Sequence, residues 1–175
     1  MGLPFTKNQV RKLGDRLRAA ETPDDADLDK LHELLESYDE SMSLAEHVLR
    51  DELGYAVSSR LKNAGTIVEK LRRNRNSHLG NIQDLAGVRM VMASNDRAEQ
   101  DAVAEAIMDR FADVSQPPRR TDRRVNPIQG YRALHLVVFV GDLPVEVQIR
   151  TSLQQSWAEY FEKLGDFFGR EIRYG

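Results

Sequence analysis

The sequence YRALHLVVFVGDLPVEVQIR, residues 131–150, decides the fold. It divides into two β segments, 131–140 and 144–150, around Gly141-Asp142, a dipeptide typical of a two-residue turn or one slightly longer. In the second segment, alternation places Glu146, Gln148 and Arg150 on one face and valine and isoleucine side chains on the other. We therefore predict a β-hairpin with one buried face and one polar face, which lies along a site or along bulk water.

Further β and helical patterns flank the hairpin. Upstream, Val88, Met90 and Met92 alternate with smaller or charged residues and predict a strand, and Ser94 or Asn95 is the expected cap of the next helix. Residues 116–130 hold three prolines, four arginines and no apolar periodicity, which predicts a loop. An amphipathic helix is expected to close the chain, with core residues Trp157, Phe161 and Leu164 on the stripe that also contains Leu153, Tyr160 and Phe168.

The first third of the chain is predicted to be helical. Residues 8–20 form a short basic amphipathic pattern, and Pro23 is expected to open a second helix as a first-turn proline. The apolar stripe of that helix runs from Leu28 to Leu53, with Leu44 on it, at a period near 3.6. Ser59 is the expected cap of a third helix, which carries Leu61, Ala64, Ile67, Val68 and Leu71.

Helices followed by the order β-α-β-β-α predict an α+β fold, in which helices flank a small, mixed, mostly antiparallel sheet. We place an N-terminal helical extension at residues 1–58 and the main domain at residues 59–175.

Composition restricts the chemistry that is available. The 175 residues include no cysteine, which excludes disulfides, thiolate metal sites and cysteine nucleophiles and suits a reducing cytoplasm. The longest apolar run, 136–140, has five residues, whereas a membrane helix needs about 20. No secretion signal precedes the first helical pattern. We expect a cytoplasmic protein that does not enter membranes.

Charge is segregated along a chain whose net charge is −3. Residues 21–52 carry twelve acidic and two basic residues, residues 60–75 carry one acidic and six basic, and residues 119–132 carry one acidic and five basic. Two basic patches in an acidic chain favour a polyanionic ligand. From charge alone, solvated surface and salt bridges to the acidic segment explain the pattern equally well.

Carboxylates near these patches suggest nucleotide-phosphate chemistry. Asp84 lies at the start of the upstream strand, and Glu146 lies on the polar face of the hairpin, near a face that Tyr131 and His135 share. Two carboxylates hold Mg²⁺ against phosphate oxygens, while Arg or Lys neutralises the remaining charge. Taken singly, Glu146 is better explained as an exposed strand residue and Asp84 as a cap or turn residue.

Four motifs, in order across residues 60–157, resemble those of the RelA/SpoT-type alarmone synthetases. Arg60-Leu61-Lys62 with Thr66-Ile67 and Lys70 is similar to R-x-K…[ST]-I-x-x-K, and IQDLAGVR at 82–89 to I-x-D-[LI]-x-[GA]-[VI]-R. GYRALH at 130–135 resembles G-Y-x-x-x-H, and EVQIRT at 146–151 resembles E-[VI]-Q-[IV]-R-T. The resemblance implies a nucleotidyltransferase-like synthetase fold. It also implies transfer of the β,γ-pyrophosphate of ATP to the 3′-hydroxyl of GDP or GTP, with Mg²⁺ as cofactor.

The resemblance also implies roles for individual residues. Asp84 and Glu146 would bind Mg²⁺, and Glu146 would also accept the proton of the acceptor hydroxyl. The ATP site would comprise Arg60 and Arg89 around the adenine, and Lys62, Thr66, Lys70 and Arg72 near the phosphates. Tyr131 would stack on the acceptor base, which His135 and Gln148 would position, and further acceptor contacts are expected from Arg123 and Arg124.

The acceptor side departs from the family pattern. Residues 126–131 read NPIQGY where the family commonly has N-P-K-x-N-G-Y, and Ala133 replaces a serine. The departure favours a second interpretation, a toxin that pyrophosphorylates the 3′-CCA end of tRNA, whose backbone the arginines of 119–132 would contact. In that case the acidic residues 21–52 would either shield the active site or bind an antitoxin protein. A catalytically inactive alarmone sensor is a third interpretation. We expect a monomer or small oligomer.

Overall fold

The computed structural model describes residues 2–113, 116–125, 127 and 130–169. In chain order, its elements are α1 (Lys7–Ala19), α2 (Asp25–His47), a π-helical turn (Val48–Glu52), β1 (Val57–Leu61), α3 (Ala64–Arg73), a 3₁₀ turn (Leu79–Asn81), β2 (Ala86–Met92), α4 (Arg97–Arg110), β3 (Arg119–Asp122), β4 (Leu134–Val140), β5 (Leu143–Thr151) and α5 (Ser152–Phe168).

A single five-stranded sheet, in the order β1-β2-β5-β4-β3, forms the centre of the molecule. The pair β2–β5 is parallel and the other three pairs are antiparallel, so the predicted mixed, mostly antiparallel sheet is confirmed. The hairpin β4–β5 turns at Gly141-Asp142, where Gly141 has a φ of 60°. The predicted α+β class is confirmed.

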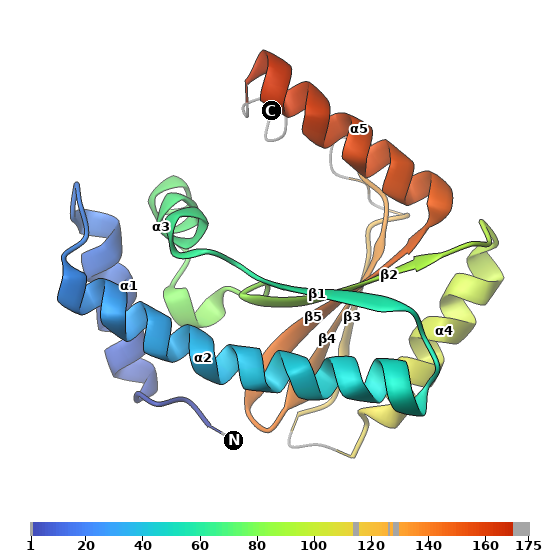
Figure 1. The fold of residues 1–175 in the computed structure, drawn as a ribbon, viewed down its shortest axis with the longest axis horizontal. Helices are drawn as coiled ribbons and strands as arrows, with labels where there is room; N and C mark the ends of the chain where they lie inside the picture. Colours follow the sequence, from blue (N-terminus) through green and yellow to red (C-terminus); the bar gives the residue numbers. More distant parts are fainter. Residues whose placement is uncertain (1, 114–115, 126, 128–129, 170–175) are drawn as a thin grey trace.

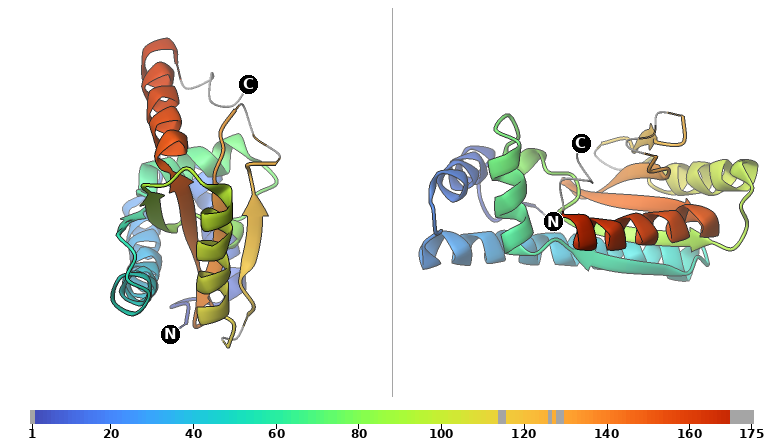
Figure 2. Two further views of the ribbon diagram at one scale, coloured as in Figure 1. Left: turned by 90° about the vertical axis from the view of Figure 1, so that its right-hand side faces the viewer. Right: turned by 90° about the horizontal axis from the view of Figure 1, so that it is seen from above.

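The helices cover the sheet unevenly (Figures 1 and 2). Helix α2 runs along the sheet, contacts β1, β2, β4 and β5, and lies below them in the view of Figure 1. Helices α3 and α5 rise on the other side, with an interval between them. Apolar residues of α1, α2 and the sheet form one core, which includes Leu17, Leu34 and Val147. Residues 58 and 59, which flank the predicted domain boundary, both lie in β1. The division at this point stays a prediction.

Two strands were not predicted. Ser59 does not cap a helix, because residues 57–61 form edge strand β1, and Asn63 caps α3 through its Oδ1, which accepts a hydrogen bond from the Thr66 amide at 2.8 Å. Edge strand β3 lies inside the predicted loop 116–130. Both strands are short, and most of their residues are exposed, so neither has the alternating burial that reveals a strand in a sequence.

Several smaller predictions are wrong by a few residues. The cap of α2 is Asp24, one residue after Pro23, and the cap of α4 is Asp96 rather than Ser94 or Asn95. In α2, Leu44 is exposed while Met42 and Ala45 are buried. A neighbouring polar or acidic residue can act as a cap equally well, which is why the sequence pattern does not select one.

Helix α5 is amphipathic as predicted, but much of its apolar surface is exposed. Trp157 is only partly buried and stacks on Phe161 with ring centroids 4.8 Å apart. Leu153, Tyr160 and Phe168 are each more than 60% exposed, at 67%, 63% and 74%. The expected placement of Trp157, Phe161 and Leu164 in the core is therefore wrong, because α5 leans on β2 and β5 and projects away from the body of the molecule (Figure 1).

No helix in the described part of the chain combines the length and apolar character needed to cross a membrane.

Candidate active site

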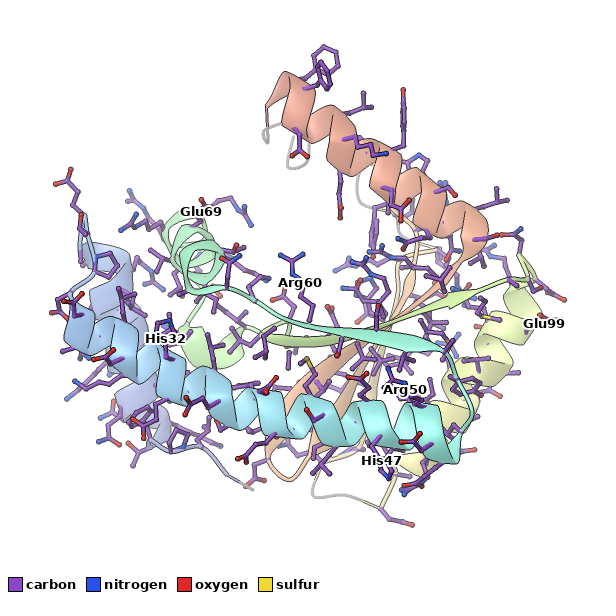
Figure 3. The ribbon with its side chains drawn as sticks, viewed as in Figure 1. His32, His47, Arg50, Arg60, Glu69 and Glu99 are labelled. Carbon is purple, nitrogen blue, oxygen red and sulfur yellow. The ribbon has the colours of Figure 1, made fainter. Side chains whose placement is uncertain are left out.

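A cavity of about 520 Å³ lies over strands β1, β2 and β5. Figure 3 shows Arg60 rising from β1 toward the interval between α3 and α5. Functional candidates from four segments of the chain line this cavity: Arg60, Lys62, Thr66, Asp84, Arg89, Glu146 and Gln148. Glu162, from α5, lies on its margin.

Strand register brings these residues together. Gly87 lies opposite Arg60 on one side and opposite Glu146 on the other, and Arg89 lies opposite Gln148. Because side chains alternate along a strand, the residues at 87 and 89 share the face that Glu146 and Gln148 occupy. Gly87 also lines the cavity, and its lack of a side chain leaves space between the Arg60 and Glu146 positions. The polar face predicted for β5 is thus the floor of the cavity.

Asp84 is held between two lysines. Its Oδ2 forms an ion pair with Lys62, and its Oδ1 lies 2.7 Å from Lys70 Nζ. Burial raises the pKa of Asp84, but the hydrogen bonds and charges of the two lysines outweigh it and hold the pKa below its ordinary value. The carboxylate is therefore ionised at neutral pH, and the ammonium groups of both lysines lie next to it.

Glu146 is held by an imidazole and an amide. His135 Nδ1 lies 2.8 Å from Oε1, and Gln148 Nε2 donates to Oε2 at 2.8 Å. The side chains of Glu146 and His135 are each only 15% exposed. Burial raises the pKa of Glu146, but the contacts with His135 and Gln148 outweigh burial and the repulsion from Asp84, so the pKa lies below its ordinary value. Glu146 is thus an ionised, partly buried hydrogen-bond acceptor.

Tyr131 joins this group from the segment before β4. Its hydroxyl lies 3.1 Å from His135 Nε2, and Arg150 Nη2 donates to the same hydroxyl at 2.8 Å. Gly130 precedes it with a φ of 79°, and a Cβ at this position would lie 2.9 Å from the Trp157 ring. A left-handed glycine packed against α5 therefore sets the direction in which the chain enters Tyr131.

Other predicted site residues lie elsewhere. Arg72 does not line the cavity, and its guanidinium donates to the carbonyls of Ala20 and Glu21. Arg124 is 7% exposed and forms ion pairs with Asp101 and Asp122. The structure thus places both guanidinium groups in contacts with the protein itself, and their role in substrate binding stays a prediction.

Two further predictions concern the acceptor segment. Arg123 is partly buried next to Arg124, and its amide donates to the Ala133 carbonyl at 3.0 Å. It does not line the cavity. Of the segment 126–131, in which the sequence departs from the family motif, residues 126, 128 and 129 lie outside the described residues.

Sequence reasoning did not select Arg150 or Glu162. Arg150 was placed on the polar face of β5, but a motif position gives no sign that the side chain is 96% buried and bonded to Tyr131. Glu162 is one of several acidic residues in α5, and only the placement of the helix beside the cavity distinguishes it.

The residues present fit a magnesium ion. Mg²⁺ prefers oxygen ligands and is usually bound through one or two carboxylates together with water and substrate phosphates. Asp84 and Glu146 supply two ionised carboxylates to one cavity, with cations nearby to hold phosphates. No group of three or more His, Asp or Glu side chains that could hold a metal occurs among the residues described, so an ion here would need substrate or water oxygens as well.

Comparisons with known proteins identify relatives of this chain. A family described as "Region found in RelA / SpoT proteins" matches residues 59–164. Uncharacterised proteins from Mycobacterium tuberculosis and Mycobacterium bovis are 37% identical over 176 residues, 98% of this chain, which spans 63% of their length.

Solved structures show the same fold. The small alarmone synthetase 1 from Bacillus subtilis is 26% identical and superposes with a TM-score of 0.68, over 81% of this chain and 82% of that one. The structure of that enzyme bound to its product pppGpp gives a TM-score of 0.64 at 24% identity, over 81% and 83% of the two chains.

Proposed function

Because the chain belongs to the RelA/SpoT family and carries its synthetase region at residues 59–164, we propose that it transfers the β,γ-pyrophosphate of ATP to the 3′-hydroxyl of GDP or GTP. The observation that supports this most directly is the convergence of Asp84 and Glu146 on one cavity lined by Arg60, Lys62 and Arg89.

The donor side has the charges that a nucleoside triphosphate needs. Lys62 and Lys70 converge on Asp84, so both ammonium groups are within one phosphate-sized region. Arg60 and Arg89 lie in the same cavity, and the Arg89 Nε is buried without a hydrogen-bond partner among the described groups. Guanidinium planes stack on nucleobases, so we assign the adenine to these arginines, and the phosphates to the lysines with Thr66 beside them.

Glu146 has the properties of a proton acceptor for the attacking hydroxyl. It is ionised, reaches the cavity, and has a fixed orientation because each oxygen has its own partner. Bound Mg²⁺, held by Asp84 and Glu146, would neutralise charge on the phosphates. Pyrophosphoryl transfer depends mainly on alignment and charge neutralisation, and a positioned base completes the requirement.

A small nucleotide fits the acceptor side better than tRNA. The tRNA interpretation relied on the arginines of residues 119–132, but Arg124 and Arg120 are paired with Asp101, and Arg124 also with Asp122. Paired cations release fewer counterions when an RNA backbone approaches and contribute less affinity. The remaining acceptor group, Tyr131 with His135 and Gln148, suits one base and its ribose.

The test is transfer of label from γ-labelled ATP to GDP, GTP or deacylated tRNA, each offered separately with Mg²⁺. Label in the guanine nucleotides supports the proposal. Label only in tRNA would show that the acceptor is the 3′ end of tRNA and not a guanine nucleotide, and a search for an antitoxin would follow. ATP left unconsumed with every acceptor would overturn the proposed activity and favour the sensor interpretation.

A further inference from the structure

Two hydrogen-bond branches start at Arg150 and meet at Glu146. In the first, Arg150 Nη2 donates to the Tyr131 hydroxyl at 2.8 Å, the hydroxyl lies 3.1 Å from His135 Nε2, and His135 Nδ1 lies 2.8 Å from Glu146 Oε1. In the second, the same Nη2 donates to Gln148 Oε1 at 3.0 Å, and Gln148 Nε2 donates to Glu146 Oε2 at 2.8 Å. The branches end on different oxygens of one carboxylate.

Arg150 and Glu146 fix the direction of the bonds from opposite ends. A guanidinium only donates, so the Tyr131 hydroxyl and the Gln148 oxygen both accept from Arg150. An ionised carboxylate only accepts, so His135 Nδ1 and the Gln148 amide nitrogen donate to Glu146. Tyr131, His135 and Gln148 are therefore held between one donor and one acceptor.

The position of Arg150 is itself fixed. Its side chain is buried, and Nη1 donates to Gln155 of α5 at 2.8 Å. The guanidinium carbon lies 5.1 Å from the centroid of the Tyr131 ring, over one face. Arg150 thus contacts Tyr131 and Gln148, which both lie on the proposed acceptor side. The donor-side lysines, Lys62 and Lys70, bond to Asp84 instead.

Resting on the proposed function, we infer that Arg150 is a positioning residue that couples acceptor binding at Tyr131 to the orientation of Glu146. It acts through Tyr131, His135 and Gln148 and does not itself touch the reacting atoms. One guanidinium thereby holds the stacking ring and the Gln148 amide, and through them orients the carboxylate toward the hydroxyl that it deprotonates.

The first test is independent of activity. Long-range ¹⁵N–¹H spectra report the tautomer of each of the four histidines, and His135→Gln assigns the relevant signal. We expect the ring signals of His135 to change in both Arg150→Lys and Tyr131→Phe, because each variant disturbs the hydroxyl that contacts Nε2. Unchanged His135 signals in both variants would overturn the inference.

The second test uses transfer kinetics. Arg150→Lys should lower kcat and raise KM for the acceptor, with a combined loss of about 10- to 100-fold, the range found for groups that orient a primary ligand or base. KM for ATP should stay near the wild-type value. Arg110→Lys is the matched control, since Arg110 pairs with Glu52 at the surface, away from the cavity.

The outcomes separate the two proposals. If the wild type transfers label but Arg150→Lys behaves as Arg110→Lys does, the role of Arg150 is wrong and the proposed function stands. If the wild type transfers nothing, the proposed function is wrong, and the spectra still test whether Arg150 orders the hydrogen bonds around Glu146. Should Arg150→Lys fail to fold, Tyr131→Phe removes the hydroxyl of the first branch while Arg150 stays in place.

Discussion

At the scale of single residues, the two carboxylates of the cavity have opposite surroundings. Asp84 is paired with two lysines that a phosphate can also bind, whereas Glu146 is held by an imidazole and an amide. The contacts of Asp84 can therefore be exchanged when an anionic substrate arrives, while those of Glu146 can persist. This difference suits Asp84 to the donor side and Glu146 to proton transfer.

Glu146→Gln tests the proton acceptor directly. The amide keeps the shape of the side chain but cannot accept the hydroxyl proton, so we expect transfer to fall by roughly 10²- to 10⁴-fold, the usual contribution of a general base. ATP binding, followed by calorimetry, should be largely kept. Glu99→Gln on the surface of α4 (Figure 3) is the control. Full activity in Glu146→Gln would remove this residue from the mechanism.

Tyr131→Ala separates the two substrates. Stacking on an aromatic ring contributes about 1–3 kcal/mol per base, so KM for the acceptor should rise much more than KM for ATP. Steady-state kinetics with each substrate varied in turn measure both values. An equal loss for ATP and acceptor would show that Tyr131 does not stack on the acceptor base.

At the scale of secondary-structure elements, a strand could be predicted from the sequence where its residues show a clear pattern of burial. From Leu143 to Ile149, strand β5 alternates buried and partly exposed residues, as the sequence pattern predicts, whereas Arg150 is buried although it follows on the polar face. Strands β1 and β3 are short edges, and the tertiary pairing that makes them strands lies far away in sequence, at β2 and β4. For α5, the pattern indicated an apolar stripe but not what would cover it.

The contact between Gly130 and α5 is an element-scale determinant of the acceptor site. Gly130→Ala adds a Cβ 2.9 Å from the Trp157 ring at a position where φ is 79°. We expect Tyr131 to shift, KM for the acceptor to rise and thermal stability to fall, with ATP affinity unchanged.

Gly54→Ala is the matched control for that variant. Gly54 has a φ of 74° and no neighbouring atom within 4 Å of the added Cβ, so it reproduces the backbone strain without the collision. Equal acceptor kinetics in the two variants would contradict a positioning role for the Gly130–Trp157 contact.

At the scale of the whole molecule, several depressed carboxyl pKa values link stability to pH. Asp84, Asp101 and Glu146 have lowered pKa values, and the hydrogen bond from Arg124 brings the pKa of Asp122 to about 2. A pKa lower in the folded than in the unfolded state stabilises the fold above the unfolded value, and this stabilisation is lost as pH falls through the folded value.

Acid unfolding should therefore begin as pH falls below about 4, the ordinary range of these carboxyl groups. Thermal melting from pH 7 to pH 2 measures it. Asp122→Asn should be clearly destabilised at pH 7, because the buried Arg124 loses a charged partner, and the difference from the wild type should shrink toward pH 2. Asp29→Asn, on an exposed part of α2, is the control. A difference that does not change with pH would contradict the linkage.

Much of the candidate site could be predicted because the motifs specify its residue types. The alternation of side chains along a strand then indicates which of these residues share a face. Asp84 and Glu146, 62 positions apart, were selected together, and the parallel pairing of β2 with β5 brings their segments into one cavity. What could not be predicted depends on side-chain partners. Arg72 and Arg124 look like substrate-binding cations in sequence, and only the folded chain reveals that backbone carbonyls and aspartates already occupy them.

The ion pairs of Asp84 with Lys62 and Lys70 make donor capture a replacement reaction. Without nucleotide, the aspartate acts as an internal surrogate for a phosphate and keeps two ammonium groups preassembled and neutralised. An incoming triphosphate displaces this surrogate, so its net gain in affinity is smaller than two new ion pairs would suggest. If the proposed function holds, the displaced Asp84 carboxylate would then be available, together with Glu146, to hold Mg²⁺, which would neutralise charge on the phosphates.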